Sequence, residues 1–177
     1  HETALKTEAE QPYLRYIKIL IGNDDHTKAQ EVLEMMAEND YWGAPLDVGI
    51  SFKRLKLYER AHTIFSRIYG SYESSPDYLH NFAQTKIAIA NELAHRRNPQ
   101  WSTVNRLRRE AVELLRRTIN LTTDKVQLAW SWFDLARTLI WLKYPKSQVQ
   151  EAFENAIALL PYERAFHESY NRWRPKS

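Results

Sequence analysis

The apolar residues of this chain recur at helical rather than strand spacing almost from end to end. Offsets of 0, 3, 4 and 7 place side chains on one face of a helix. The first two segments that follow this rule are Tyr13, Tyr16, Ile17 and Leu20, then Ala29, Val32, Leu33 and Met36. Because the same spacing continues through most of the chain, we expect an all-α fold.

Helix breakers divide the pattern into segments that follow one another in pairs. Ser75 and Pro76 fit an N-cap followed by proline at the first helical position, and Ser147 with Gln150 fits a capping box. A short last helix is expected after Pro161. The other expected helices are residues 10–22, 26–38, 44–56, 58–69, 76–96, 101–120, 124–142 and 147–159.

The helix pairs repeat at a nearly constant interval. The small residues Ala29 and Ala61, each on the second helix of its pair, are 32 residues apart, close to the period of about 34 residues of one helical repeat class. The clearest repeat motifs are Gly49-x-x-Phe52, then Tyr58-x-x-Ala61-x-x-x-Phe65, and a stretch from Glu151 to Pro161, EAFENAIALLP. These motifs resemble those of the tetratricopeptide repeat (TPR) family, and the resemblance covers residues 10–161.

The resemblance implies a right-handed α-solenoid of stacked antiparallel hairpins. It implies a flank at residues 1–9, and a capping helix with a tail at 162–177. The four degenerate hairpins would be 10–41, 42–75, 76–123 and 124–161, the third elongated by about 15 residues. Ile17 and Lys86 depart from the family pattern.

Composition and motifs argue against catalysis and against a bound cofactor or metal. Only 4 of 177 residues are Gly, which disfavours glycine-rich phosphate loops, and the chain has no Cys. Its six His residues form no metal-binding or catalytic motif. No apolar run approaches the roughly 18 residues that a membrane span needs. We therefore expect a cytoplasmic binding module, and its start at His1 suggests a piece of a longer, multidomain protein.

The family resemblance implies a concave groove that would hold a partner peptide. Cations beside carboxamides would bind a carboxylate or an acidic peptide, as in the carboxylate clamp of some members. Trp130 and Phe133 would also line the groove. A solvated charged face, and a last helix (Phe166, Tyr170, Trp173) that merely covers Trp130 and Trp141, are the alternatives. The predicted partner-binding residues are Lys18, Lys53, Arg54, Asn81, Gln84, Arg137 and Trp141.

A second candidate surface is the arginine-rich segment from His95 to Arg117. It carries a net charge of +5, whereas the rest of the chain sums to −2. Such a segment suits an acidic protein surface or nucleic-acid phosphate, although an exposed charged helix face is the simpler interpretation. The residues predicted for this patch are Arg96, Arg97, Arg106, Arg109 and Arg117.

These observations favour a protein–protein interaction module, a scaffold or sensor region that binds a peptide or partner protein. The binding surface would be either the groove or the elongated third hairpin. A nucleic-acid-contacting helical repeat that uses residues 95–117 is one alternative. A structural or self-association segment is another.

Overall fold

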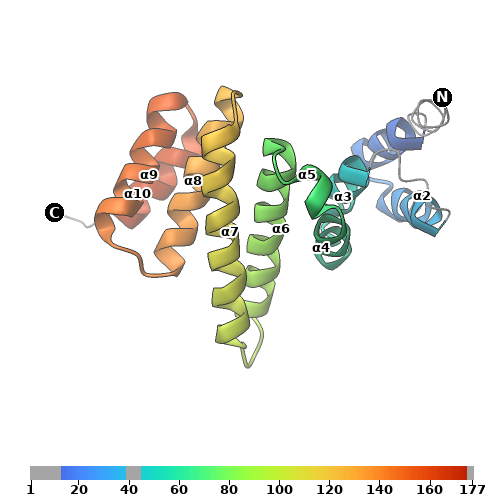
Figure 1. Ribbon diagram of the computed structural model, residues 1–177, viewed down its shortest axis with the longest axis horizontal. Coiled ribbons are helices and arrows are strands. Elements are labelled where there is room, and N and C mark those ends of the chain that lie inside the picture. Colours follow the sequence, from blue (N-terminus) through green and yellow to red (C-terminus); the bar gives the residue numbers. More distant parts are fainter. Residues whose placement is uncertain (1–12, 39–44, 175–177) are drawn as a thin grey trace. The chain divides into compact units, whose positions relative to one another are not determined.

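The computed structural model describes residues 13–38 and 45–174, and the described chain consists of helices joined by short turns (Figure 1). The predicted flank at 1–9 and the junction between the first two predicted hairpins lie outside the described residues. The all-α prediction is confirmed. The helices are residues 13–22, α2 (His26–Glu38), α3 (Pro45–Arg54), α4 (Tyr58–Arg67), α5 (Tyr69–Tyr72), α6 (Pro76–Ala94), α7 (Trp101–Leu121), α8 (Lys125–Trp141), α9 (Lys146–Leu159) and α10 (Arg164–Trp173).

The helix ends agree with the sequence pattern to within a few residues, with two local differences. A four-residue helix, α5, occupies part of the loop expected from Gly70 to Pro76. Ser75 caps α6 as predicted, because its hydroxyl accepts from the backbone N–H of Tyr78, and Pro76 opens the helix. The capping box predicted at Ser147 is wrong, since α9 begins one residue earlier, after Pro145, without a side-chain cap.

The chain divides into two compact units, His1–Ser71 and Tyr72–Ser177, each of which is described by itself. We call them the N-terminal and C-terminal units. In the N-terminal unit, α3 packs on α4 and contacts α2. Phe52 and Phe65 are fully buried between these helices, and Gly49 lies against the ring of Phe65. Arg60 on α4 bonds Glu34 on α2, with 3.2 Å between Nε and Oε1.

Three of the hairpin turns have the same backbone geometry. Each contains one residue with positive φ, namely Asp24, Lys56 or Lys143. The next residue's N–H bonds back to the carbonyl five residues earlier, as in Leu57 to Phe52 (3.0 Å) and Tyr144 to Leu139 (3.0 Å). This is the bonding of a Schellman helix end. The repeat is therefore visible in the turns as well as in the helices.

The C-terminal unit contains the longest hairpin, formed by α6 and α7 of 19 and 21 residues (Figure 1). The packing runs from α6 to α7, from α7 to α8, and from α8 to α9, and α10 lies against α9. Helices α6 and α8 also contact each other directly. One face of the unit is therefore built from α6 and α8.

The off-pattern Lys86 has a partner on the neighbouring helix. It is 7% exposed, and its Nζ lies 2.7 Å from Oε2 of Glu110 on α7 and 4.4 Å from the ring centroid of Phe82. Glu110 also accepts from Arg106 (2.9 Å). A buried lysine is tolerated here because its charge is paired and hydrogen-bonded. The departure from the repeat pattern therefore reflects an ion pair that joins α6 to α7.

This ion pair predicts an acid-sensitive contribution to stability. Burial raises the pKa of Glu110, but the hydrogen bonds and charges of Lys86 and Arg106 outweigh it, so the pKa lies below its ordinary value. A depressed carboxyl pKa stabilises the fold above the unfolded pKa of about 4, and this contribution is lost as pH falls through the folded pKa. Glu110→Gln should therefore cost about 1 kcal/mol at pH 7, since Glu110 is partly exposed.

The measurement is urea unfolding of the full chain at pH 7 and at pH 3. The difference between wild type and Glu110→Gln should be smaller at pH 3 than at pH 7, because the contribution of Glu110 is lost as pH falls through its lowered folded-state pKa. Glu113→Gln, an exposed change on the same helix, is the matched control and should show no such pH dependence. An equal effect of Glu110→Gln at both pH values would contradict the assignment.

Candidate functional site

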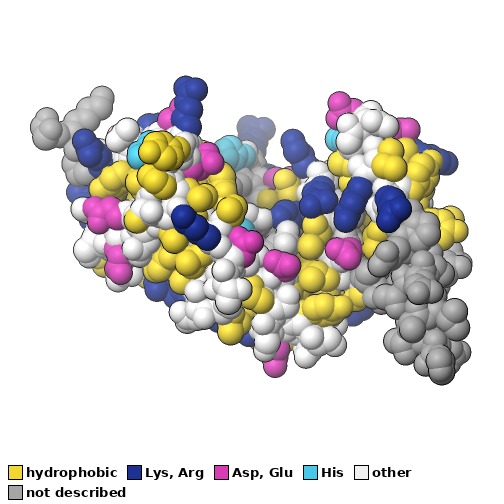
Figure 2. All heavy atoms as spheres, turned by 90° about the horizontal axis from the view of Figure 1, so that it is seen from above, with side chains coloured by type: hydrophobic (Ala, Val, Ile, Leu, Met, Phe, Trp, Pro, Cys, Tyr) yellow, Lys and Arg dark blue, Asp and Glu magenta, His cyan; other side chains and the backbone are white. Residues whose placement is uncertain are grey.

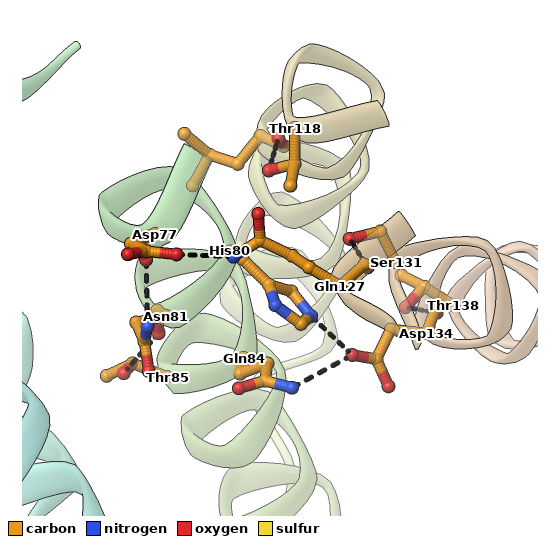
Figure 3. Close-up of polar contacts among 11 residues, drawn as sticks. Asp77, His80, Asn81, Gln84, Thr85, Thr118, Gln127, Ser131, Asp134 and Thr138 are labelled. Carbon is orange, nitrogen blue, oxygen red and sulfur yellow. Dashed lines mark hydrogen bonds and ion pairs between the residues drawn. The ribbon is translucent and has the colours of Figure 1, made fainter. Parts of the chain in front are cut away.

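A polar network joins α6 to α8 through the carboxylate of Asp134 (Figure 3). The Oδ2 atom of Asp134 lies 3.2 Å from Nε2 of His80 and accepts from Nε2 of Gln84 at 3.1 Å. His80 is 9% exposed. Gln84 was predicted to contact a ligand, and the structure shows that its amide also connects two helices.

The same face carries a second connection nearer the start of both helices. Gln127 on α8 donates to Oδ1 of Asp77 on α6 at 2.7 Å and accepts from the hydroxyl of Thr122 at 2.7 Å. Asn81, another predicted ligand residue, donates to the backbone carbonyl of Asp77 at 2.8 Å. We call the surface formed by Asp77, His80, Asn81, Gln84, Gln127 and Asp134 the α6–α8 face.

Beside the α6–α8 face, α8 forms a pocket with α9 and α10. Its volume is about 550 Å³, which lies within the range of ligand-binding pockets. Five aromatic rings line it, together with two arginines, a serine and a glutamate. These lining residues are Trp130, Phe133, Trp141, Phe153, Trp173, Arg137, Arg172, Ser169 and Glu168.

The two arginines give the pocket its charge. The guanidinium of Arg137 lies 5.5 Å from the ring centroid of Phe133 and 5.4 Å from that of Trp141. Both Arg137 and Arg172 are exposed, and neither forms an ion pair within the described residues. Glu168 is paired with Arg164, one turn earlier on α10. The pocket therefore offers two guanidinium groups whose hydrogen-bonding capacity is available.

Helix α10 covers only part of the aromatic surface of α8. Phe166, the one buried residue of α10, lies 4.9 Å from Trp130 and 4.8 Å from Phe133, measured between ring centroids. Trp173 packs on Phe153 of α9, 5.8 Å away. The predicted covering of Trp130 is thus present, whereas Trp141 remains half-buried in the pocket wall.

A buried arginine beside the pocket was missed in the sequence. Arg108 on α7 is 6% exposed, and its guanidinium lies 4.8 Å from the ring centroid of Trp141. Its Nη2 donates weakly to Asn91 at 3.4 Å, and its buried Nε has no hydrogen-bond partner. Burial lowers the pKa of Arg108. Its spacing from Val104, Leu107 and Ala111 places it on the apolar face of the helix. That spacing is the sequence feature from which its burial could have been predicted.

We expect Arg108→Met to stabilise the full chain by about 1 kcal/mol, because it removes an incompletely paired buried charge. Arg109→Met, an exposed change on the same helix, should stay within about 0.5 kcal/mol of wild type. Thermal and urea unfolding measure both. A loss of stability larger than that of Arg109→Met would show that the contact with Trp141 outweighs the cost of burial.

The arginines of the predicted basic patch are dispersed. Arg106 is paired with Glu110, and Arg117 donates to the backbone carbonyl of Glu73. The two arginines are about 16 Å apart along α7, given the rise per residue of a helix. Arg96 and Arg97 lie exposed in the turn after α6, and Arg109 is exposed on α7. On the face of the C-terminal unit that the left part of Figure 2 shows, basic side chains are interspersed with acidic and hydrophobic ones.

The predicted groove residues fall into two sets. Lys18, Lys53 and Arg54 belong to the N-terminal unit, where Lys18 and Arg54 are exposed and Lys53 is half-buried. Asn81, Gln84, Arg137 and Trp141 belong to the C-terminal unit, and the site described above includes only these four. No group of three or more metal-ligating side chains occurs in the described residues. None of the described helices is both long and apolar enough for a membrane span.

Comparison with known proteins bears on the fold. No protein-family model and no curated protein matches this chain. Among solved structures, a thermophilic TPR protein of Thermus thermophilus is similar over 92% of this chain and 97% of that chain, with a TM-score of 0.52 and 12% identity. The predicted TPR-like fold is thereby confirmed.

Proposed function

We propose that this chain, whose fold is that of TPR proteins, is a protein-interaction module that binds a partner segment on its C-terminal unit. The binding surface would consist of the α6–α8 face and the adjoining pocket of α8, α9 and α10. The observation that carries the proposal is the pocket, which combines five aromatic rings with two arginines that have no ion pair in the described chain. Aromatic residues and arginine are enriched at protein interfaces.

Binding fits these residues better than catalysis does. The ionisable side chains of the α6–α8 face are bonded to neighbouring side chains: Asp134 to His80 and Gln84, and Asp77 to Gln127. Catalysis requires an acid, base or nucleophile aimed at a substrate position. These contacts hold α6 and α8 in register and thereby present a fixed surface to a partner.

The test is selection of a random peptide library, about ten residues per member, on the full chain. We expect enriched peptides whose affinity falls at least tenfold in Trp141→Ala, because Trp141 lines the pocket. The matched control is Trp101→Ala, which removes a tryptophan that is 53% exposed on α7. Failure to enrich any peptide, or equal loss in both variants, would overturn the proposal.

The nucleic-acid alternative has a separate prediction. If residues 95–117 bind phosphate, a labelled single-stranded oligonucleotide should bind the full chain with steep salt dependence. Changing Arg106 and Arg109 together to Glu should then abolish binding. Under our proposal the same double change leaves the affinity for selected peptides within about twofold, because neither side chain lines the pocket. Self-association would instead appear as concentration-dependent sedimentation of the full chain.

A further inference from the structure

The pocket of α8, α9 and α10 is lined by more cations than anions. Two of its lining residues are cations, Arg137 and Arg172, and its single anion, Glu168, already interacts with Arg164. A third cation, Arg108, lies behind the pocket wall against the ring of Trp141. An anionic group beside Arg137 would relieve the repulsion between these guanidinium groups. Charge complementarity therefore favours an anionic ligand group.

The geometry of Arg137 suits a carboxylate in particular. Its guanidinium lies over the rings of Phe133 and Trp141, which limits its rotation and leaves its N–H groups directed along its own plane. A planar guanidinium fork matches the two oxygens of a carboxylate. Ser169 adds a hydroxyl donor to the same lining.

The rest of the pocket wall is mainly aromatic and favours a ligand with an apolar group. Trp130, Trp141, Phe153 and Trp173 surround a volume of about 550 Å³, larger than a carboxylate alone would fill. An apolar side chain that entered this space would remove aromatic surface from water. The ligand group therefore needs a large apolar part directly beside a carboxylate.

We propose that this pocket anchors a partner segment in which a large apolar side chain is adjacent to Asp or Glu. The inference rests on the proposed function and names the chemistry of the partner. A peptide suits the pocket better than a free small acid, because small-molecule sites bury most of their ligand whereas Arg137, Arg172 and Glu168 are exposed. The rest of the segment would lie on the neighbouring α6–α8 face.

Fluorescence anisotropy with defined peptides tests this on the full chain. The probe is a labelled peptide of about ten residues with Glu-Phe-Glu at its centre and Gly-Ser flanks. Its comparators carry Gln-Phe-Gln, Glu-Ala-Glu or Lys-Phe-Lys at the centre. We expect each comparator to bind at least tenfold more weakly than Glu-Phe-Glu, because each lacks the charge or the apolar anchor.

Protein variants locate the effect. Changing Arg137 and Arg172 together to Met should weaken the Glu-Phe-Glu probe about tenfold or more and reduce its preference over Gln-Phe-Gln. The matched control changes Arg96 and Arg109 to Met, which alters net charge equally and should leave affinity within about twofold. Ser169→Phe, which places a ring in the pocket, should also abolish binding, and circular dichroism verifies that each variant is folded.

Several outcomes would overturn the inference. One is equal affinity for Glu-Phe-Glu and Gln-Phe-Gln, and another is equal loss in the two double variants. A third is competition by 3-phenylpropionate, a small acid with an aromatic ring. If it displaces the probe with an inhibition constant equal to the dissociation constant of the probe, the pocket is a site for a free acid and not for a peptide. If library peptides bind in a Trp141-dependent manner but Glu-Phe-Glu does not, this inference fails and the proposed function stands. If neither binds, both fail.

Discussion

Replacing Gly49 by Ala is expected to destabilise the N-terminal unit by about 2 kcal/mol, although Ala favours helix formation by up to about 1 kcal/mol over Gly. A Cβ atom at this position would lie 2.6 Å from Cε1 and 3.0 Å from Cδ1 of Phe65. The ring of Phe65 is fully buried, so it has little room to move. The absence of a side chain at Gly49 is therefore what lets α3 approach α4 closely.

Urea unfolding, with hydrogen exchange of the α4 amides as a local probe, measures this effect. Gly22→Ala is the matched control, since Gly22 ends a helix and has no atom within 4 Å of an added Cβ. That change should be neutral or slightly stabilising. In the Gly49→Ala background, Phe65→Leu should cost less than it does alone, because the smaller side chain relieves the clash. Equal stability of Gly49→Ala and Gly22→Ala would refute this account of the packing.

Replacing Phe166 by Ala is expected to cost about 3–5 kcal/mol of local stability and to release α10. The side chain of Phe166 is fully buried, and it is the only buried residue of α10. Its ring contacts Trp130 and Phe133 of α8. Without it, α10 would keep mainly the half-buried contacts of Tyr170 and Trp173 with Phe153.

Hydrogen exchange of the α10 amides should accelerate strongly in Phe166→Ala, while the α6 and α7 amides stay protected. Peptide binding should fall with it, because α10 supplies Ser169, Arg172 and Trp173 to the pocket. Tyr162→Ala is the control, since Tyr162 is 97% exposed, and it should change neither quantity. Unchanged protection of α10 in Phe166→Ala would show that other contacts hold this helix.

The helices were predictable because their apolar faces follow a local rule. Lys86 and Arg108 were not, since a charge on a buried face depends on what the neighbouring helix offers. Glu110 is 24 residues from Lys86 in the sequence, and Trp141 is on a different helix from Arg108. The start of α9 was also predicted incorrectly. The helix begins directly after the turn at Tyr144-Pro145 and not at the predicted Ser147 cap.

The candidate site was predictable on α8 and missed on α10. Arg137 and Trp141 were predicted as ligand residues because the family pattern places them on the first helix of a hairpin. Arg172 was not, since the last helix was interpreted as a cap or as a self-association segment and not as part of a ligand site. The bond between His80 and Asp134 spans 54 residues, and no local pattern pairs them. The binding roles of all the predicted groove residues and of the arginine patch stay predictions.

The indole N–H signals of the tryptophans test the central claim most directly. Five of them belong to described residues: Trp130, Trp141 and Trp173 line the pocket, whereas Trp101 and Trp132 do not. Titration of the ¹⁵N-labelled full chain with the Glu-Phe-Glu peptide should shift the first three signals, with Trp101 and Trp132 unchanged. Shifts confined to Trp101 or Trp132, or no shift at saturating peptide, would contradict the account.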